Sequence, residues 1–279
     1  MPVTDELISQ ALAALDVVIV RRLRDGGQKT VKLVARDGDE LVLKVVAVGS
    51  SSPAALSRAR REVELLGSID DPHVVHAASH LVELGDPVEG AAWLEEFLQG
   101  EDLDALLTGP WTWADAAAMA ADVAAGLSAL HAIDVVHRDL SANNVRRLSS
   151  DGSYVVMDPG FARHVLRAGL TVGGQPGTAG YLSPEHLQSY SGVPTAASDV
   201  FGLGILMFLA LTAEFPIPAA GDEADYLRRV AVGETQDLAL LRPDLSQSQV
   251  ALVKRALHPQ SARRFRNAAR FAEALEAIE

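Results

Sequence analysis

Short Val-rich runs separated by turns fill the first part of the chain. They cover residues 17–23 (VVIVRRL), 31–36 (VKLVAR) and 41–48 (LVLKVVAV), and the turn 37–40 (DGDE) separates the last two. β-branched runs bounded by an Asp-Gly turn are typical of antiparallel strands. Apolar residues at helical spacing predict one helix over 55–69, and the apolar runs 73–84 and 91–98 predict further strands.

After Gly100 the pattern becomes mostly helical. We expect helices over 103–108, 112–132, 184–190, 197–212, 223–231, 246–257 and 267–278. The longest apolar run, 200–213 (VFGLGILMFLALTA), is too short to span a bilayer and is typical of a buried helix. The sequence therefore predicts an α+β fold, with a small antiparallel sheet and one helix followed by a larger helical part.

Composition narrows the function classes. The chain has 279 residues, no cysteine and a formal net charge of −13. Without cysteine there is no disulfide, thiol nucleophile or cysteine-bound metal. The negative charge disfavours nucleic acid and anionic membranes as partners. The basic run 254–270 is a local exception that we interpret as a solvated helical face. We expect no signal peptide and no membrane segment in this chain, and a cytoplasmic location.

Polar residues in two loops and one strand offer chemistry. Asp139 in 137–144 (HRDLSANN) is a candidate proton acceptor, and Asn144 together with Asp158 in 155–160 (VVMDPG) makes an oxygen-ligand set suited to magnesium. Lys44 on a predicted strand can pair with Glu62 on the predicted helix. Each residue alone is as well explained as a loop cap or surface charge, but the ordered set is not.

This ordered set resembles the protein kinase family, specifically the eukaryotic-like Ser/Thr kinases found in bacteria. The matching motifs are Lys44, Glu62, His137-Arg138-Asp139 with Asn144, Asp158-Pro159-Gly160 and Ser183-Pro184-Glu185. In 177–185 (GTAGYLSPE), Thr178 favours Ser/Thr over Tyr specificity. In 198–204 (SDVFGLG) the resemblance implies that Asp199 holds the catalytic loop, and in 262–275 it implies that Arg264 pairs with Glu185. The resemblance covers roughly residues 17–278.

The resemblance implies a bilobal kinase fold in one domain over 1–279. The N-lobe would cover about 1–98, the hinge about 96–102 and the C-lobe about 103–279. The implied activity is transfer of the γ-phosphoryl group of ATP, with Mg²⁺ or Mn²⁺, to Ser/Thr of protein substrates and to the chain itself.

The same resemblance assigns roles to residues. Lys44 would bind the α- and β-phosphates and Glu62 would hold Lys44. Asp158 and Asn144 would bind the metal, and Asp139 would accept the substrate's hydroxyl proton.

Further nucleotide contacts follow from position. Backbone groups of Glu96 and Leu98 would meet adenine, and Asp102 would reach the ribose. Glu95 stands where the family usually has an apolar residue at the back of the pocket. The glycine-rich loop keeps only Gly26 and Gly27, with Arg24 and Lys29 near the outer glycine positions.

Two more departures concern catalysis and switching. Ser141 replaces the lysine that neutralises the γ-phosphate, and Pro159 replaces the phenylalanine of the Asp-Phe-Gly turn. Arg138 is placed to read phosphate on the activation segment, where Thr171 is the best regulatory candidate and Thr178 a further one. A regulatory protein partner is a further expectation.

Two alternatives remain open. The altered catalytic devices are also compatible with a pseudokinase that acts as a nucleotide-binding or scaffolding module. A small-molecule phosphotransferase is disfavoured, because 183–185 (SPE) and 198–204 (SDVFGLG) resemble a protein-substrate platform.

Overall fold

The computed structural model describes residues 3–23, 29–48, 54–159, 179–187 and 194–278. The chain divides into two compact units. Unit 1 comprises Met1–Asp70 and Val74–Gln99, and unit 2 comprises Asp71–His73 and Gly100–Glu279.

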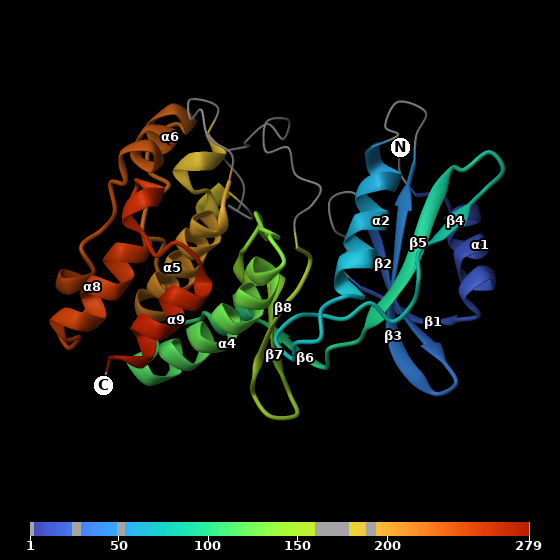
Figure 1. The fold of residues 1–279 in the computed structure, drawn as a ribbon, viewed down its shortest axis with the longest axis horizontal. Helices are drawn as coiled ribbons and strands as arrows, with labels where there is room; N and C mark the ends of the chain where they lie inside the picture. Colours follow the sequence, from blue (N-terminus) through green and yellow to red (C-terminus); the bar gives the residue numbers. More distant parts are fainter. Residues whose placement is uncertain (1–2, 24–28, 49–53, 160–178, 188–193, 279) are drawn as a thin grey trace. The chain divides into compact units, whose positions relative to one another are not determined.

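The sheet of unit 1 has five antiparallel strands in the order β1-β2-β3-β5-β4 (Figure 1). They are β1 (Val18–Arg22), β2 (Lys29–Arg36), β3 (Asp39–Ala47), β4 (Val82–Leu84) and β5 (Gly90–Glu96). A two-residue turn joins β2 to β3, and both of its residues, Asp37 and Gly38, have positive φ angles of 54° and 96°. This is the geometry that matches the twist of a hairpin, so the predicted hairpin is confirmed.

Two helices cover the two faces of this sheet. Helix α1 (Asp5–Leu15) packs against one face through Leu7, Ala11 and Leu15, which lie four residues apart on one side of the helix. Helix α2 (Ala54–Leu66) lies on the other face (Figure 1). Its residues Ala59 and Val63 belong to one buried cluster with Trp93. The sequence predicted one helix here, so α1 is an addition to the predicted fold.

The strand predicted over 73–84 is wrong except for β4. In the part of 73–84 that precedes β4, hydrogen bonds to side chains and single backbone bonds replace a regular ladder. The Ser79 hydroxyl accepts the Leu94 N–H, and the Glu96 carboxylate accepts the His76 N–H. These acceptors satisfy the backbone without a continuous strand, and an isolated bridge pairs Ala77 with Glu95.

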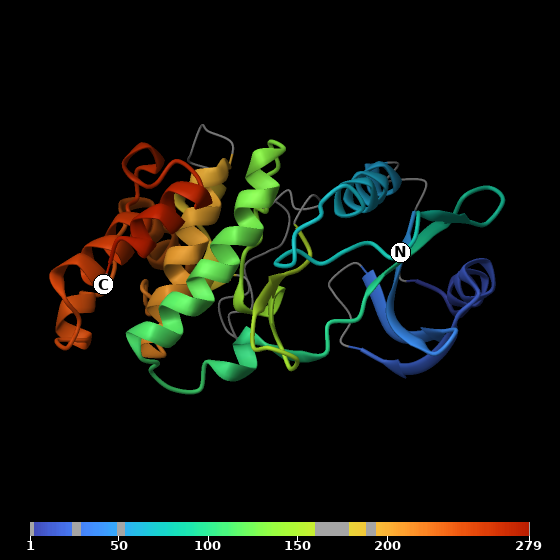
Figure 2. The ribbon, with the colours of Figure 1, turned by 60° about the horizontal axis from the view of Figure 1, so that its bottom comes forward.

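Unit 2 is mainly helical. Its small sheet has the order β6-β7-β8, from β6 (Gly100–Asp102), β7 (Val145–Leu148) and β8 (Tyr154–Val156). The helices are α3 (Leu103–Leu106), α4 (Trp113–Ala132), α5 (Ala196–Thr212), α6 (Glu223–Val232), α7 (Leu238–Leu241), α8 (Gln247–Ala256) and α9 (Ala268–Glu276). Helices α4, α5 and α9 lie side by side, as Figure 2 shows. The predicted mixed α+β architecture is confirmed.

The segment 184–190 does not form the predicted helix in its described part. It makes a short 3₁₀ turn, η4 (Pro184–His186), and Leu187 leaves the turn in an extended conformation with ψ of 142°. Helix α5, by contrast, matches its apolar run and is buried along nearly its whole length. In the described parts of the chain, no helix combines the length and apolar character that a membrane crossing needs.

Candidate active site

Lys44 lies in the middle of β3 and forms a buried ion pair with Glu95 of β5. The distance from its Nζ to the Glu95 carboxylate is 2.7 Å, and the two side chains are 5% and 3% exposed. Glu95 also accepts a hydrogen bond of 2.8 Å from the Trp93 indole N–H. This pairing gives Glu95 a role at a position where the resemblance left an unexplained charge.

Glu62 on α2 lies near a second lysine. The Nζ of Lys29, the first residue of β2, is 2.5 Å from the Glu62 carboxylate and 5.3 Å from the centre of the Trp93 ring. Lys29, Lys44 and Glu62 also make further interactions. The predicted Lys44–Glu62 pair stays a prediction.

In unit 2, Asp199 of α5 fixes the backbone of the loop 137–144, for which the resemblance implies a catalytic role. Its carboxylate accepts the N–H groups of His137 at 2.8 Å and Arg138 at 2.9 Å. Arg138 has a positive φ of 65°, a conformation that costs free energy for a residue with a side chain. The buried carboxylate offsets that cost. The imidazole of His131 on α4 lies 2.8 Å from the same carboxylate.

The polar residues of the loop are tied to one another. The Asn144 side-chain amide donates to the backbone carbonyl of Asp139 at 2.8 Å, and the Met157 N–H donates to the Asn144 carbonyl at 2.8 Å. The His137 imidazole lies 2.9 Å from the Met157 carbonyl, next to Asp158, which has a φ of 49°. Two bonds therefore join the loop to Met157, the residue before Asp158, and the third holds the loop itself together.

These contacts fit the expected metal ligands. Because the Asn144 nitrogen donates to the backbone, its side-chain oxygen is the atom that can face a cation. Amide and carboxylate oxygens are the ligands that Mg²⁺ prefers. Asn144 and Asp158 are thus suited to the Mg²⁺ that the resemblance implies.

Two predicted nucleotide contacts have partners within their own units. The Asp102 carboxylate in β6 forms an ion pair with Arg146 of β7, with an oxygen-to-guanidinium distance of 2.8 Å. In unit 1 the Glu96 N–H donates to the His76 carbonyl at 3.1 Å. The Glu96 N–H therefore already has a partner within unit 1. Leu98 is buried, with 8% of its surface exposed.

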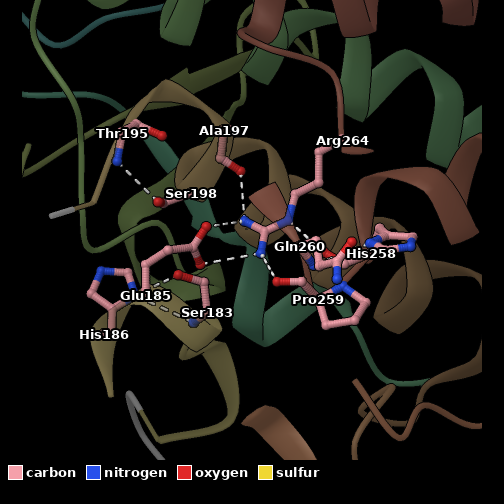
Figure 3. Close-up of polar contacts among 10 residues, drawn as sticks. All are labelled: Ser183, Glu185, His186, Thr195, Ala197, Ser198, His258, Pro259, Gln260 and Arg264. Atoms are coloured by element: carbon pink, nitrogen blue, oxygen red, sulfur yellow. Dashed lines mark hydrogen bonds and ion pairs between the residues drawn. The ribbon is translucent and has the colours of Figure 1, made fainter. Parts of the chain in front are cut away.

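The structure brings Glu185 and Arg264 together, as Figure 3 shows. Two parallel bonds of 2.7 and 3.1 Å join the guanidinium to the carboxylate. The guanidinium also donates to the carbonyls of His258, Pro259 and Ala197. Arg264 therefore joins η4, the start of α5 and the segment before α9.

His186 follows Glu185 and closes the same turn. Its Nδ1 lies 2.8 Å from the Ser183 hydroxyl and accepts the Ser183 N–H at 3.3 Å. Burial lowers the pKa of His186 below its usual value, and the nearby carboxylates offset part of this shift. The ring therefore favours its neutral form in the folded chain.

Two residues that depart from the motifs of the resemblance are buried. Ser141 is buried, and its carbonyl accepts the Asn144 N–H at 3.0 Å, so the residue supports the loop but supplies no charge. Pro159 is also buried. Gly26, Gly27, Thr171 and Thr178 lie outside the described residues.

A comparison with protein families decides the identity. A family model described as the protein kinase domain matches residues 18–276. The chain belongs to the protein kinase domain family. The resemblance on which the kinase fold was predicted is therefore confirmed.

Similar proteins agree with this assignment. Serine/threonine-protein kinase pkn2 of Myxococcus xanthus is 29% identical over 275 residues, which are 93% of this chain and 32% of that protein. Mitogen-activated protein kinase kinase 7 of Arabidopsis thaliana is 28% identical over 82% of this chain and 74% of that protein.

Serine/threonine-protein kinase PknH of Mycobacterium tuberculosis (strain ATCC 25618 / H37Rv) is 30% identical over 78% of this chain and 34% of that protein. The kinase domain thus spans about a third of the length of the two bacterial relatives. These relatives favour the Ser/Thr kinase prediction over the pseudokinase alternative.

Sequence reasoning missed several contacts of this kinase domain. It left Glu95 without a partner and placed Lys29 only near the nucleotide loop. It also gave no role to His131, or to Arg146 opposite Asp102. The available signal was an acid in the apolar run 91–98, which needs a buried cation.

Proposed function

We propose that this kinase domain transfers the γ-phosphoryl group of ATP to Ser or Thr hydroxyls of proteins. The hydroxyl oxygen forms a bond to the γ-phosphorus, the bond from that phosphorus to the β–γ bridging oxygen breaks, and ADP leaves. The hydroxyl proton passes to the Asp139 carboxylate. Such a base is typically worth about 10²–10⁴-fold in rate.

The observation that carries this proposal is the backbone geometry around Asp139. Asp199 fixes the loop before Asp139, and Asn144 binds the Asp139 carbonyl after it. A rigid loop of this kind orients a carboxylate, which is most of what phosphoryl transfer asks of a protein. A scaffolding module has no need of an aligned proton acceptor.

The other predicted roles belong to the same proposal. When bound, ATP–Mg²⁺ supplies the phosphoryl group and the cation that neutralises its charge. Asn144 and Asp158 would bind the Mg²⁺ through oxygen atoms, and Lys44 would bind the α- and β-phosphates. Because Ser141 brings no positive charge, we expect a slower enzyme than kinases with a lysine at that position.

Regulation would act through the activation segment. Arg138 would bind a phosphate on Thr171, and a regulatory protein is a further expected partner. We propose a cytoplasmic setting on the sequence alone.

Intact-mass spectrometry tests the proposal. The chain is treated with phosphatase, freed of it, incubated with Mg²⁺ and ATP, and compared with Asp139→Asn and Lys44→Met. We expect phosphate on Ser or Thr of the wild type, and at least about a hundredfold slower gain in Asp139→Asn. Asp104→Asn, an exposed carboxylate on α3, serves as the matched control.

A different outcome would decide against phosphoryl transfer. If ATP raises the unfolding temperature of the wild type but adds no mass, the chain is a nucleotide-binding module. Phosphate gained equally by Asp139→Asn would point to a contaminating kinase.

A further inference from the structure

Glu95 is a buried acid in the middle of an apolar strand. It is 2% exposed, and its neighbours Trp93 and Leu94 on β5 are fully buried. A carboxylate at such a place needs a cation or strong donors, because desolvation disfavours its charge. The Lys44 ammonium and the Trp93 indole N–H supply both.

The strand register explains why these three side chains meet. Lys44 on β3 lies directly opposite Trp93 on β5. Glu95 is two residues beyond Trp93, so it points to the same face of the sheet. Side chains on one face at directly opposite and diagonal positions are within reach of each other. The contact is therefore a property of the sheet alone.

A second ion pair, between Lys29 and Glu62, lies over the same face of the sheet. Lys29 lies on the same face, because Val31 is opposite Lys44 and Lys29 is two residues before Val31. Lys29 contacts Glu62 and lies over Trp93. Lys29, Lys44 and Glu95 have Trp93 as a common neighbour, and the formal charges of the two pairs sum to zero.

The two departures from the kinase pattern are thus complementary. Glu95 adds a negative charge where the family usually has an apolar residue, and Lys29 adds a positive charge near an outer glycine position. One without the other would leave a partly buried charge without compensation. With both present, Lys29 pairs with Glu62, and Lys44 can have the additional carboxylate of Glu95 beside it.

We propose that Glu95 is a positioning residue for Lys44, in addition to Glu62. Its carboxylate holds the Lys44 ammonium from within the sheet, so that the position of the ammonium does not depend on helix α2 alone. This inference rests on the proposed function, in which Lys44 binds the phosphates of ATP. A cation fixed before binding loses less conformational freedom when phosphate arrives.

The first test measures nucleotide binding rather than phosphoryl transfer. Calorimetry gives the affinities of the wild type and of Glu95→Gln for Mg²⁺-ATP and for adenosine. Glutamine retains a carbonyl for the Trp93 N–H but loses the charge. We expect ATP affinity to fall about tenfold or more, the size of a lost charge-assisted hydrogen bond, and adenosine affinity to stay unchanged.

The matched control is Glu83→Gln on β4. Glu83 also forms an ion pair, with Arg60, but that pair lies at the surface of the same sheet. We expect this variant to bind ATP and adenosine like the wild type. Equal loss of both ligands in Glu95→Gln would mean a general structural role and would overturn the inference.

Two further outcomes separate this inference from the proposed function. If the wild type binds ATP and Glu95→Gln binds it equally tightly, Glu95 does not position Lys44 for the phosphates. If the variant binds ATP more tightly, Glu95 competes with phosphate for Lys44. The inference alone is then overturned. If the wild type binds no ATP at all, the proposed function fails and this inference fails with it.

A second test needs no nucleotide. Glu95→Met leaves Lys44 beside an apolar side chain, and we expect its unfolding temperature to fall. The double variant Lys44→Met/Glu95→Met removes both charges and should recover much of the loss. Additive effects of the two substitutions would contradict a direct pairing of Lys44 with Glu95.

Discussion

Arg264 and Glu185 are 79 residues apart in the sequence and form a buried ion pair with two parallel hydrogen bonds. Their side chains are 0% and 2% exposed. The pair joins the turn η4 to the segment before α9, so it links two parts of unit 2 that are far apart in the sequence.

We predict that Arg264→Met lowers the free energy of unfolding by about 3–5 kcal/mol, because it leaves the Glu185 carboxylate buried without its cation. Chemical denaturation of the wild type and the variant measures this difference. The neighbouring Arg263 is exposed, and Arg263→Met should change stability by less than about 0.5 kcal/mol. Similar small effects of both substitutions would contradict a structural role for the buried pair.

Asp199→Asn should damage the catalytic loop more than the rest of the fold. The amide keeps one acceptor oxygen, where the carboxylate now accepts the N–H groups of both His137 and Arg138. We predict that the free energy of unfolding falls by at least about 2 kcal/mol and that kcat falls by a larger fraction of its wild-type value than the stability does. Steady-state kinetics alongside denaturation checks both values. A variant with normal kcat would show that the loop keeps its geometry without this carboxylate.

Gly126→Ala should destabilise α4 although alanine favours helices. A Cβ at this position would lie 2.3 Å from the His73 carbonyl oxygen, so the segment at His73 would have to move. Crowding of this kind typically costs about 1–3 kcal/mol, more than the helix propensity returns. Differential scanning calorimetry measures the change. Gly109→Ala, whose Cβ would meet no atom within 4 Å, is the control and should be nearly neutral.

The turn at His186 predicts a pH dependence of stability. Burial lowers the pKa of this histidine, so the unfolded chain binds a proton more readily than the folded chain. The contribution is fully present above the unfolded pKa of about 6.5 and is lost as the pH falls below it. Protonation would also remove the acceptor for Ser183. The charges of Glu185, Asp199 and Asp139 reduce the effect without reversing it.

Unfolding temperatures of the wild type and His186→Asn between pH 8 and pH 5 test this sign. Asparagine keeps an acceptor near Ser183 and does not titrate. The wild type should lose more stability on acidification than the variant. Parallel curves for the two proteins would assign the acid sensitivity to other groups.

The sequence predicted the elements whose pattern is local. Helix α5 follows from an unbroken apolar run, and the hairpin of β2 and β3 follows from Asp37 and Gly38 between Val-rich segments. The segment 73–84 misled because its apolar residues resemble a strand. Its backbone bonds depend on Ser79 and Glu96, and a propensity argument does not include such acceptors.

The candidate site shows a similar division. Motif spacing predicted roles for Asp139, Asn144 and Asp158, and the structure adds the hydrogen bonds around the first two; their roles stay predictions. The pairing of Lys44 with Glu95 depends on the register between β3 and β5, where a shift of one residue would turn one of them to the other face. Such a register is set by the whole sheet, so the sequence alone could flag Glu95 but not its partner.

The contacts of His131 determine which of its ring nitrogens carries the hydrogen next to Asp199. Its Nδ1 accepts the N–H of Ala268, the first residue of α9, at 3.2 Å. An N–H in the first turn of a helix has no partner within that helix, and here the ring supplies one. In the neutral ring the hydrogen must then sit on Nε2, the nitrogen that faces Asp199. Helix α9 thereby selects the His131 tautomer whose Nε2–H donates to the Asp199 carboxylate. The same carboxylate accepts the Arg138 N–H.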